Sequence, residues 1–211
     1  TKNIMDICVY VVDDDQQVRE SLEWLLESVN LTTQLFKNGQ EFLDTFSTGL
    51  PGCVVLDVRM PGINGMDLHQ LIKQIDKDFP VIIVTGHADV PMALRAMKEG
   101  AFDFIEKPYN DQHLLERIQV AIHQHGAAQK EQEKNKTLSV LFNQLSKRET
   151  QVLDGVLQGK SNKSIAEMLC ISVKTIEVHR ANLMSKLNVK TVTELVRLAI
   201  EADHDRTTHT Q

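Results

Sequence analysis

The sequence predicts an α/β domain with a doubly wound parallel sheet of five strands, followed by a small all-α domain of four helices. Three observations support this fold. Short apolar runs alternate with helical patterns in the first part of the chain, a polar stretch follows, and four short helical patterns complete the 211 residues. We place the first domain at residues 5–124, a linker expected to be helical at 125–143, and the second domain at 144–204.

The strands of the first domain are predicted from short, mostly apolar runs rich in β-branched residues, which are typical of strands buried on both faces. These runs lie at residues 7–12, 32–36, 53–56, 81–84 and 102–105. Between them, apolar residues recur at spacings of three and four, which predicts helices at 16–29, 40–46, 66–75, 90–99 and 111–123. This alternation indicates helices on both faces of the sheet and a ligand site at the carboxyl ends of the strands.

The helices of the second domain are predicted from the residues that begin and end them. Ser146 and Glu149 form a capping-box pattern at the first helix. Ser161 and Ser172 begin the second and third helices, and Thr191 begins the last. Residues 126–137, which precede these helices, are polar and charged without apolar periodicity, as in a linker.

Charge is divided unevenly along the chain, whose net charge is −6. Residues 1–125 hold 19 acidic and 10 basic residues, whereas residues 145–200 hold 5 acidic and 9 basic residues. An acidic first domain and a basic second domain suggest separate tasks, with polyanion binding assigned to the second.

Three further features favour a cytoplasmic protein. No apolar run approaches the length of a membrane helix, so we expect no membrane partner. The first residues do not have the pattern of a secretory signal. Cys8, Cys53 and Cys170 are widely spaced and fit neither a disulfide framework nor a zinc site, which favours reduced thiols.

Chemically active side chains lie at the ends of four predicted strands: they are Asp13, Asp14, Asp15, Asp57, Thr85 and Lys107. In a parallel sheet these groups converge on one edge. Acidic residues crowded at one point repel each other, and a divalent cation relieves that repulsion. Oxygen ligands favour Mg²⁺ as this cation.

Asp57 is the expected nucleophile, because a carboxylate can attack a phosphoryl group to form an acyl phosphate. Lys107 can neutralise the phosphoryl oxygens and the Thr85 hydroxyl can donate to one of them. Acidic residues at strand ends are often solvated loop residues, and a single Thr or Lys after a strand is usually without function. The combination at four separate strand ends favours the phosphoryl chemistry.

The motifs at these strand ends resemble the receiver domain of bacterial two-component response regulators over about residues 5–124. They are VVDDD at 11–15, DVRMPG at 57–62, Gly65, TGH at 85–87 and FIEKP at 104–108. The run GHADVPM at 86–92 further resembles the FixJ branch. The resemblance implies a flavodoxin-like strand order 2-1-3-4-5.

The same resemblance implies a role for each matching residue. Asp13, Asp14, Asp57 and the backbone carbonyl of Arg59 would bind Mg²⁺, with Asp57 as the phosphoacceptor. Thr85 and Lys107 would sense the phosphoryl group, Phe104 would be the aromatic switch residue, and the Lys107–Pro108 peptide would be cis.

The second domain has the pattern of a helix-turn-helix. Two helical segments, around residues 162–169 and 173–187, are joined by a tight turn, and the second has a mixed polar face that can meet phosphates and base edges. A helical bundle for protein docking fits the helix pattern equally well, and the basic charge favours DNA. In the turn, a packed Cys170 is favoured over a redox-active one.

The motifs LSKRE at 145–149, GKSNK at 159–163 and TIEVH at 175–179 resemble the LuxR/NarL-type effector domain. By that resemblance Glu177, Val178 and Ala181 would face base edges. The candidates for backbone contacts are Lys163, Lys174, Thr175, His179, Arg180 and Lys186. Family members often carry Lys at the positions of Glu177 or Ala181, so base preferences cannot be transferred.

We therefore interpret the chain as a regulator of the FixJ/NarL family and not as an enzyme, apart from the receiver's own phosphoryl transfer and slow dephosphorylation. A sensor histidine kinase would phosphorylate it, and it would dimerise and bind promoter DNA, with RNA polymerase as a further candidate partner. The dimer would form through the receiver face at residues 90–99, 102–105 and 111–123, or through the last helix.

Two other functions fit the sequence less well. A phosphohydrolase of the haloacid-dehalogenase type would carry its nucleophile on the first strand and would need a cap domain. A DNA-binding protein with a degenerate receiver would lack part of the set Asp14, Asp57, Thr85 and Lys107, which is complete here.

Overall fold

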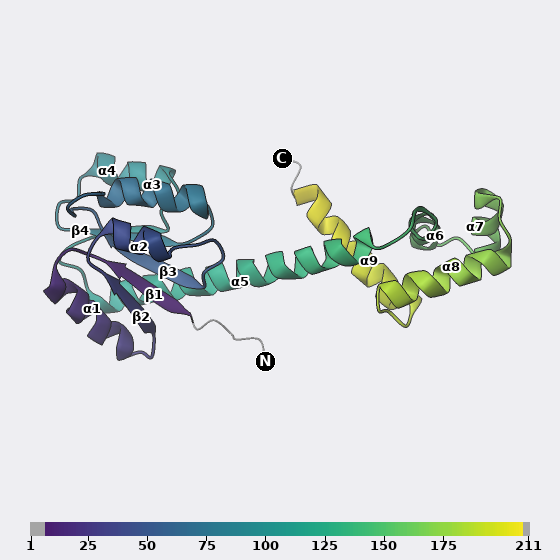
Figure 1. The fold of residues 1–211 in the computed structure, drawn as a ribbon, viewed down its shortest axis with the longest axis horizontal. Helices are drawn as coiled ribbons and strands as arrows, with labels where there is room; N and C mark the ends of the chain where they lie inside the picture. The colour runs from purple at the N-terminus through teal and green to yellow at the C-terminus, as the bar shows by residue number, and fades with distance from the viewer. Residues whose placement is uncertain (1–6, 209–211) are drawn as a thin grey trace. The chain divides into compact units, whose positions relative to one another are not determined.

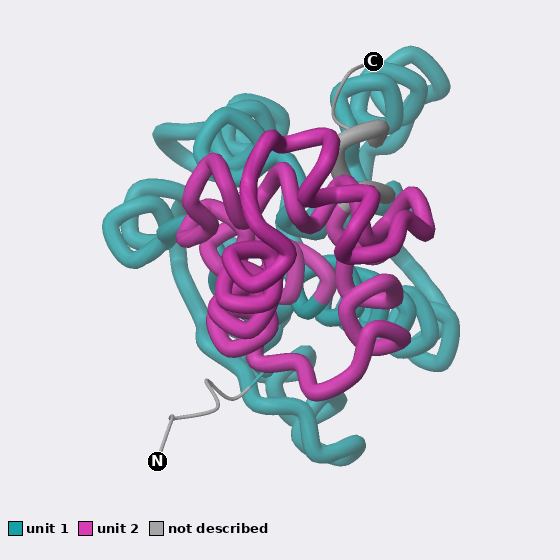
Figure 2. Tube along the Cα trace, turned by 90° about the vertical axis from the view of Figure 1, so that its right-hand side faces the viewer, with its two compact units in different colours: residues 1–130 teal, residues 131–211 magenta. Residues whose placement is uncertain are grey.

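The computed structural model describes the backbone of residues 7–208 and the side chains of residues 7–202. The chain divides into two compact units, residues 1–130 and residues 131–211 (Figure 2). One helix, α5 (Asp111–Asn143), contributes to both units.

The first unit contains a five-stranded sheet in which every neighbouring pair of strands is parallel (Figure 1). The strands are β1 (Cys8–Val12), β2 (Thr32–Phe36), β3 (Gly52–Asp57), β4 (Val81–Thr85) and β5 (Asp103–Glu106). Their order is β2-β1-β3-β4-β5, which confirms the predicted strand order. The carboxyl ends of β1, β3, β4 and β5 therefore lie along one edge.

Helices cover both faces of this sheet, which confirms the doubly wound fold. The helices are α1 (Gln16–Glu27), α2 (Gly39–Thr45), α3 (Gly65–Ile75), α4 (Val90–Lys98) and the first part of α5. Side chains alternate along β1, so that Tyr10 and Val12 pack with α2, α3 and α4, while Val9 and Val11 pack with α1 and α5.

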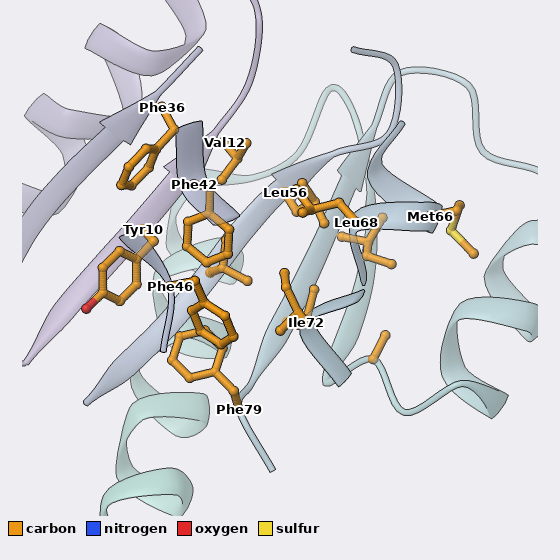
Figure 3. Close-up of a cluster of buried hydrophobic side chains, with 14 of the residues drawn as sticks. Tyr10, Val12, Phe36, Phe42, Phe46, Leu56, Met66, Leu68, Ile72 and Phe79 are labelled. Carbon is orange, nitrogen blue, oxygen red and sulfur yellow. The ribbon is translucent and has the colours of Figure 1, made fainter. Parts of the chain in front are cut away.

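The larger of the two cores is built around aromatic rings (Figure 3). Tyr10 from β1 packs against Phe42 of α2 and against Phe79, which precedes β4. Phe42 stacks on Phe46, and Phe46 meets Phe79 edge to face. This cluster fixes α2 and α3 on one face of the sheet and thereby positions the loops at its carboxyl edge.

Helix α5 joins two predicted segments into one element. The helix predicted at 111–123 and the linker expected to be helical at 125–143 form a single helix that continues to Asn143. The apolar period stops where the helix leaves the sheet, but residues 127–136 are Ala, Gln, Lys, Glu and Asn, most of which favour helices. Apolar periodicity thus predicts a helix where it packs against a core, and it gives no prediction where a helix is solvated.

The second unit contains the end of α5 and four further helices, α6 (Lys147–Leu157), α7 (Asn162–Leu169), α8 (Val173–Lys186) and α9 (Val192–Thr208). The predicted caps are confirmed: Ser146 and Glu149 form the capping box of α6, and Ser161 and Ser172 accept backbone hydrogen bonds at α7 and α8. The buried apolar residues of α6, α7, α8 and α9 form one core.

The turn between α7 and α8 corrects one prediction. Cys170 ends α7 in a left-handed conformation with φ of 53°, and its backbone N–H bonds back to the last turn of the helix. The backbone therefore closes the helix, and the Cys170 side chain is exposed. The prediction of a packed Cys170 is wrong.

In the described part of the chain, no helix is long and apolar enough to cross a membrane.

Candidate functional site

Asp13, Asp57 and Lys107 meet at the carboxyl edge of the sheet. Lys107 Nζ lies 2.8 Å from Asp13 Oδ2 and 2.8 Å from Asp57 Oδ1, so one ammonium group pairs with two carboxylates. Asp13 follows β1 and Asp57 ends β3, and these two strands are neighbours. The parallel strand order thus joins side chains that lie 94 and 50 positions apart in the sequence.

Burial and hydrogen bonding act in opposite directions on the pKa values of this group. Both carboxylates are buried. Burial raises the pKa of Asp13, and the hydrogen bond from Lys107 offsets part of that rise. Burial also acts to lower the pKa of Lys107, but the hydrogen bonds to Asp13 and Asp57 outweigh it, and the pKa of Lys107 is raised. Lys107 therefore remains a cation at neutral pH, placed against Asp57.

The loop after β3 holds the second oxygen of Asp57. Asp57 Oδ2 accepts a hydrogen bond from the Arg59 N–H at 2.6 Å. The start of α3 closes on this loop, where the Gly65 N–H donates to the Val58 carbonyl at 2.9 Å. A Cβ atom at Gly65 would lie 2.1 Å from the Asp57 carbonyl oxygen, so this position admits only glycine without a shift of the loop.

Thr85 lies on β4, which pairs with β3, and Phe104 lies on β5, which pairs with the far side of β4. Thr85 ends β4 and is buried, and its hydroxyl oxygen accepts a hydrogen bond from the His87 N–H at 3.3 Å. The Thr85 carbonyl accepts from the Lys107 N–H at 2.8 Å, which aligns the ends of β4 and β5. Phe104 on β5 is half-buried and packs against the larger core. The Lys107–Pro108 peptide is cis, as the resemblance implied.

The predicted metal ligands are only partly gathered. Asp14 follows Asp13, but its side chain is exposed. Among the residues that the structure describes, no three His, Cys, Asp or Glu side chains are placed to hold one metal ion. Asp13 and Asp57 nevertheless fit a cation, since the Lys107 ammonium contacts both. Their carboxylate oxygens are ligands of the kind that Mg²⁺ prefers.

The exposed face of α8 carries most of the residues predicted to contact DNA. The exposed ones on α8 are Lys174, Thr175, Glu177, Val178 and Ala181, and His179 and Arg180 are half-buried. Lys163 is exposed in the first turn of α7. Ile176 and Leu183, on the opposite side of α8, are fully buried in the core of the unit.

Two basic side chains among the predicted DNA-contact residues have partners within the unit. Arg180 Nη1 donates to Asn162 Oδ1 at 2.8 Å and so joins α8 to the first residue of α7. Lys186 Nζ lies 2.7 Å from Glu149 Oε2 and donates to the Gln144 carbonyl at 3.1 Å. The hydrogen bond from Lys186 is the main cause that lowers the pKa of Glu149 to about 2.

Sequence reasoning missed three residues that position these groups: Arg19, Asn162 and, apart from its capping role, Glu149. Arg19 Nη1 donates to the Asp13 carbonyl at 2.7 Å. The spacing of residues in the sequence does not predict the contacts of these three residues, because each contact joins a side chain to a group on another element or loop. Glu149 alone gave a signal, because the sequence already predicted it as the capping acid of the first helix in this unit.

Comparison with family models identifies both units. Residues 9–119 match the model described as "Response regulator receiver domain". Residues 143–199 match the model described as "Bacterial regulatory proteins, luxR family".

Relatives match over nearly the whole chain. The transcriptional regulatory protein FixJ of Bradyrhizobium diazoefficiens is 46% identical over 92% of this chain and 95% of its own length. The response regulator protein TodT of Pseudomonas putida is 38% identical over 90% of this chain and 84% of its own length. Among solved structures, the response regulator StyR has a TM-score of 0.87 at 39% identity and covers 93% of this chain and 99% of its own. Full-length FixJ from B. japonicum has a TM-score of 0.57 at 45% identity, with coverage of 93% and 97%.

Proposed function

Since the chain belongs to the bacterial response regulators that join a receiver domain to a LuxR-type DNA-binding domain, we propose that Asp57 accepts the phosphoryl group that controls it. The chain is a phosphorylation-controlled transcription regulator. We assign the receiver to residues 5–124, the linker to 125–143 and the DNA-binding domain to 144–204.

The observation that carries this proposal is the position of Lys107, 2.8 Å from both Asp13 and Asp57. A fixed ammonium beside Asp57 can neutralise charge on an incoming phosphoryl group. Asp57 is the acidic residue of this group that ends a strand, and its two oxygens are held by Lys107 and by the Arg59 N–H. These contacts orient the carboxylate before any phosphoryl donor arrives.

The proposed reaction is a transfer from a phosphohistidine of a sensor histidine kinase. An oxygen of Asp57 forms a bond to phosphorus while the P–N bond of the donor breaks, and the released imidazole takes up a proton. The Lys107 ammonium neutralises negative charge on the phosphoryl oxygens. The Thr85 hydroxyl gives up its hydrogen bond from the His87 N–H and donates a hydrogen bond to one of these oxygens. Asp13, Asp14, Asp57 and the Arg59 carbonyl would hold Mg²⁺, which supplies further positive charge to the phosphoryl oxygens.

Phosphorylation would then change the surface around β5. Movement of Thr85 toward the phosphoryl group leaves room for Phe104 to turn inward from its half-buried position. The neighbouring helix α4 presents apolar side chains to solvent, with Val90 72% exposed and Leu94 55% exposed. A second candidate surface for dimerisation is α9, where Ile200 is 56% exposed. Dimerisation through either surface would place two DNA-binding domains on a promoter with two half-sites.

DNA would meet the exposed face of α8. Glu177, Val178 and Ala181 would lie against base edges, and the candidates for phosphate contacts are Lys163, Lys174, Thr175, His179, Arg180 and Lys186. Because Arg180 and Lys186 already have partners within the unit, we expect Lys163 and Lys174 to carry more of the phosphate binding. The regulator would act in the cytoplasm, with RNA polymerase as a further candidate partner.

Mass spectrometry after incubation with acetyl phosphate tests the assignment of Asp57. The full chain should gain one phosphoryl mass with Mg²⁺ and none with a chelator, and Asp57→Ala should gain none under either condition. The exposed Asp44 on α2 provides a matched control, and Asp44→Asn should be labelled like the unaltered chain. Labelling of Asp57→Ala at an unchanged rate would show that the assignment is wrong.

A further inference from the structure

Asp13 is held at all of its polar atoms. Its backbone N–H donates to the Phe36 carbonyl at 3.2 Å, and its carbonyl accepts from Arg19 Nη1 at 2.7 Å. Its Oδ1 accepts from the Asp15 N–H at 2.9 Å, and its Oδ2 accepts from Lys107 Nζ at 2.8 Å. Of these four contacts, only two come from charged side chains, and of those two the one made by Arg19 has no part in the function proposed above.

Arg19 reaches its partner from the first part of α1. Its backbone N–H bonds to the Asp15 carbonyl, and its half-buried side chain runs back to the loop before the helix. The Asp13 carbonyl lies beyond the last residue of β1, where no strand residue pairs with it. A buried carbonyl needs a partner, and a charged guanidinium makes a short, strong hydrogen bond to it.

The Asp13 carbonyl belongs to the peptide group that leads into Asp14. Because the peptide group is planar, a partner that fixes the carbonyl oxygen also fixes the direction in which the chain enters Asp14. The Asp14 carboxylate is exposed, and in the described part of the structure no hydrogen bond or ion pair holds it. Its placement therefore depends on its backbone.

We propose that Arg19 is a positioning residue for cation binding, which sets the direction of the Asp14 carboxylate by holding the Asp13 carbonyl. The inference rests on the proposed function, in which Asp13, Asp14 and Asp57 hold Mg²⁺. Partners behind the direct ligands of a metal typically contribute about 10–100-fold to its affinity. Arg19 would act in this way through a peptide group.

The charge of Arg19 has the opposite effect, which makes the inference testable. A permanent cation beside an acidic site weakens the binding of a second cation. If charge alone mattered, removal of Arg19 would tighten Mg²⁺ binding. If positioning matters more, removal of Arg19 weakens Mg²⁺ binding. Arg19→Lys, which retains the charge but loses the planar guanidinium group, then also weakens Mg²⁺ binding.

Isothermal titration of the full chain with Mg²⁺ decides between these outcomes. We expect Arg19→Met to raise the dissociation constant by about 10-fold or more, and Arg19→Lys to raise it by a smaller factor. The half-saturating Mg²⁺ concentration for labelling by acetyl phosphate should rise with it, while the rate at saturating Mg²⁺ stays within about twofold of the unaltered chain.

Arg117→Met serves as the control. Arg117 is likewise half-buried and paired, with Asp103, but it lies on α5 away from Asp13. Its loss should leave Mg²⁺ binding unchanged. Circular dichroism checks the fold, and if Arg19→Met does not fold, Arg19→Lys decides the question.

An unchanged or lower dissociation constant in a folded Arg19 variant would overturn the inference, as would an equal increase in Arg117→Met. A wild-type chain that binds no Mg²⁺ would overturn the proposed metal site and the inference together. Normal binding by the wild type and by the Arg19 variants would overturn the inference alone.

Discussion

Lys186 Nζ lies 2.7 Å from Glu149 Oε2 and so joins the end of α8 to the start of α6. Glu149 is almost completely buried, and it also accepts the capping hydrogen bond from the Ser146 N–H. The predicted DNA contact at Lys186 is therefore also a structural contact, and variants of this residue affect folding as well as binding.

Lys186→Met should destabilise the DNA-binding unit, because it leaves a buried carboxylate without its charged partner. We expect a loss of about 1–3 kcal/mol in the free energy of unfolding, measured by urea denaturation. Lys186→Arg should lose less, and Lys174→Met, at an exposed position on the same helix, should be close to neutral. Equal stability of Lys186→Met and the wild type would contradict this role.

Acid should weaken the same unit in a defined range of pH. The pKa of Glu149 falls from its ordinary value of 4.5 to about 2 in the folded state. A lowered pKa contributes stability that is fully present above about pH 4.5 and is lost as the pH falls toward 2. Denaturation of wild type and Glu149→Gln across this range should show a steeper loss for the wild type.

Two buried histidines should make the first unit sensitive to mild acid. Burial lowers the pKa of both His69 and His125 below the ordinary value of 6.5. The unfolded chain then binds more protons than the folded one, so stability is fully present above about pH 6.5 and decreases as the pH falls below it. Urea denaturation at pH 7.5 and 5.5 should show this decrease, and His69→Leu should reduce it. A pH-independent wild type would contradict the burial argument.

Gly65→Ala should impair both stability and phosphorylation, because its Cβ would lie 2.1 Å from the Asp57 carbonyl oxygen. The backbone of the phosphoacceptor loop would have to shift. Labelling by acetyl phosphate at saturating Mg²⁺ should slow by at least about 10-fold, since small displacements of a reacting group are costly. Gly126→Ala is the matched control, because nothing lies within 4 Å of its Cβ position in α5. That variant should be labelled normally.

DNA binding should depend on salt in proportion to the phosphate contacts. Lys174→Ala should weaken binding to all promoter fragments similarly and reduce the slope of log affinity against log salt by about 0.9. Substitution of the exposed Val178 should instead change which sequence is preferred. Titrations with a fragment that begins at residue 131 are suitable, because this unit includes Leu138, which is buried, and the Lys134–Glu201 ion pair. A Lys174→Ala variant with an unchanged slope would remove Lys174 from the interface.

The strands were predictable from their short apolar runs and the helices that cover the sheet from their apolar spacing. The strand order came from the resemblance to receiver domains, and the convergence of Asp13, Asp57, Thr85 and Lys107 at one edge then follows from parallel topology. The continuation of α5 past residue 123 was not predictable from apolar spacing, since that segment packs against little. Contacts such as Arg19 with the Asp13 carbonyl, or Arg180 with Asn162, depend on how loops and helices meet in space, and sequence spacing carries no signal for them.

In the proposed function, phosphorylation of Asp57 promotes dimerisation and DNA binding. A complete switch from 1:99 to 99:1 needs about 5.5 kcal/mol. New hydrogen bonds from Thr85 and Lys107 to the phosphoryl group contribute about 1.5–3 kcal/mol each. Together they can complete the switch only if the inactive state is not favoured by much more than this before phosphorylation, so some activity should remain without phosphate.

Sedimentation velocity with parallel DNA titration, with and without beryllofluoride as a phosphoryl mimic, tests this claim most directly. The wild type should change from monomer to dimer and bind promoter DNA more tightly with the mimic, whereas Asp57→Ala should do neither. A wild type that stays monomeric with unchanged DNA affinity would contradict the account.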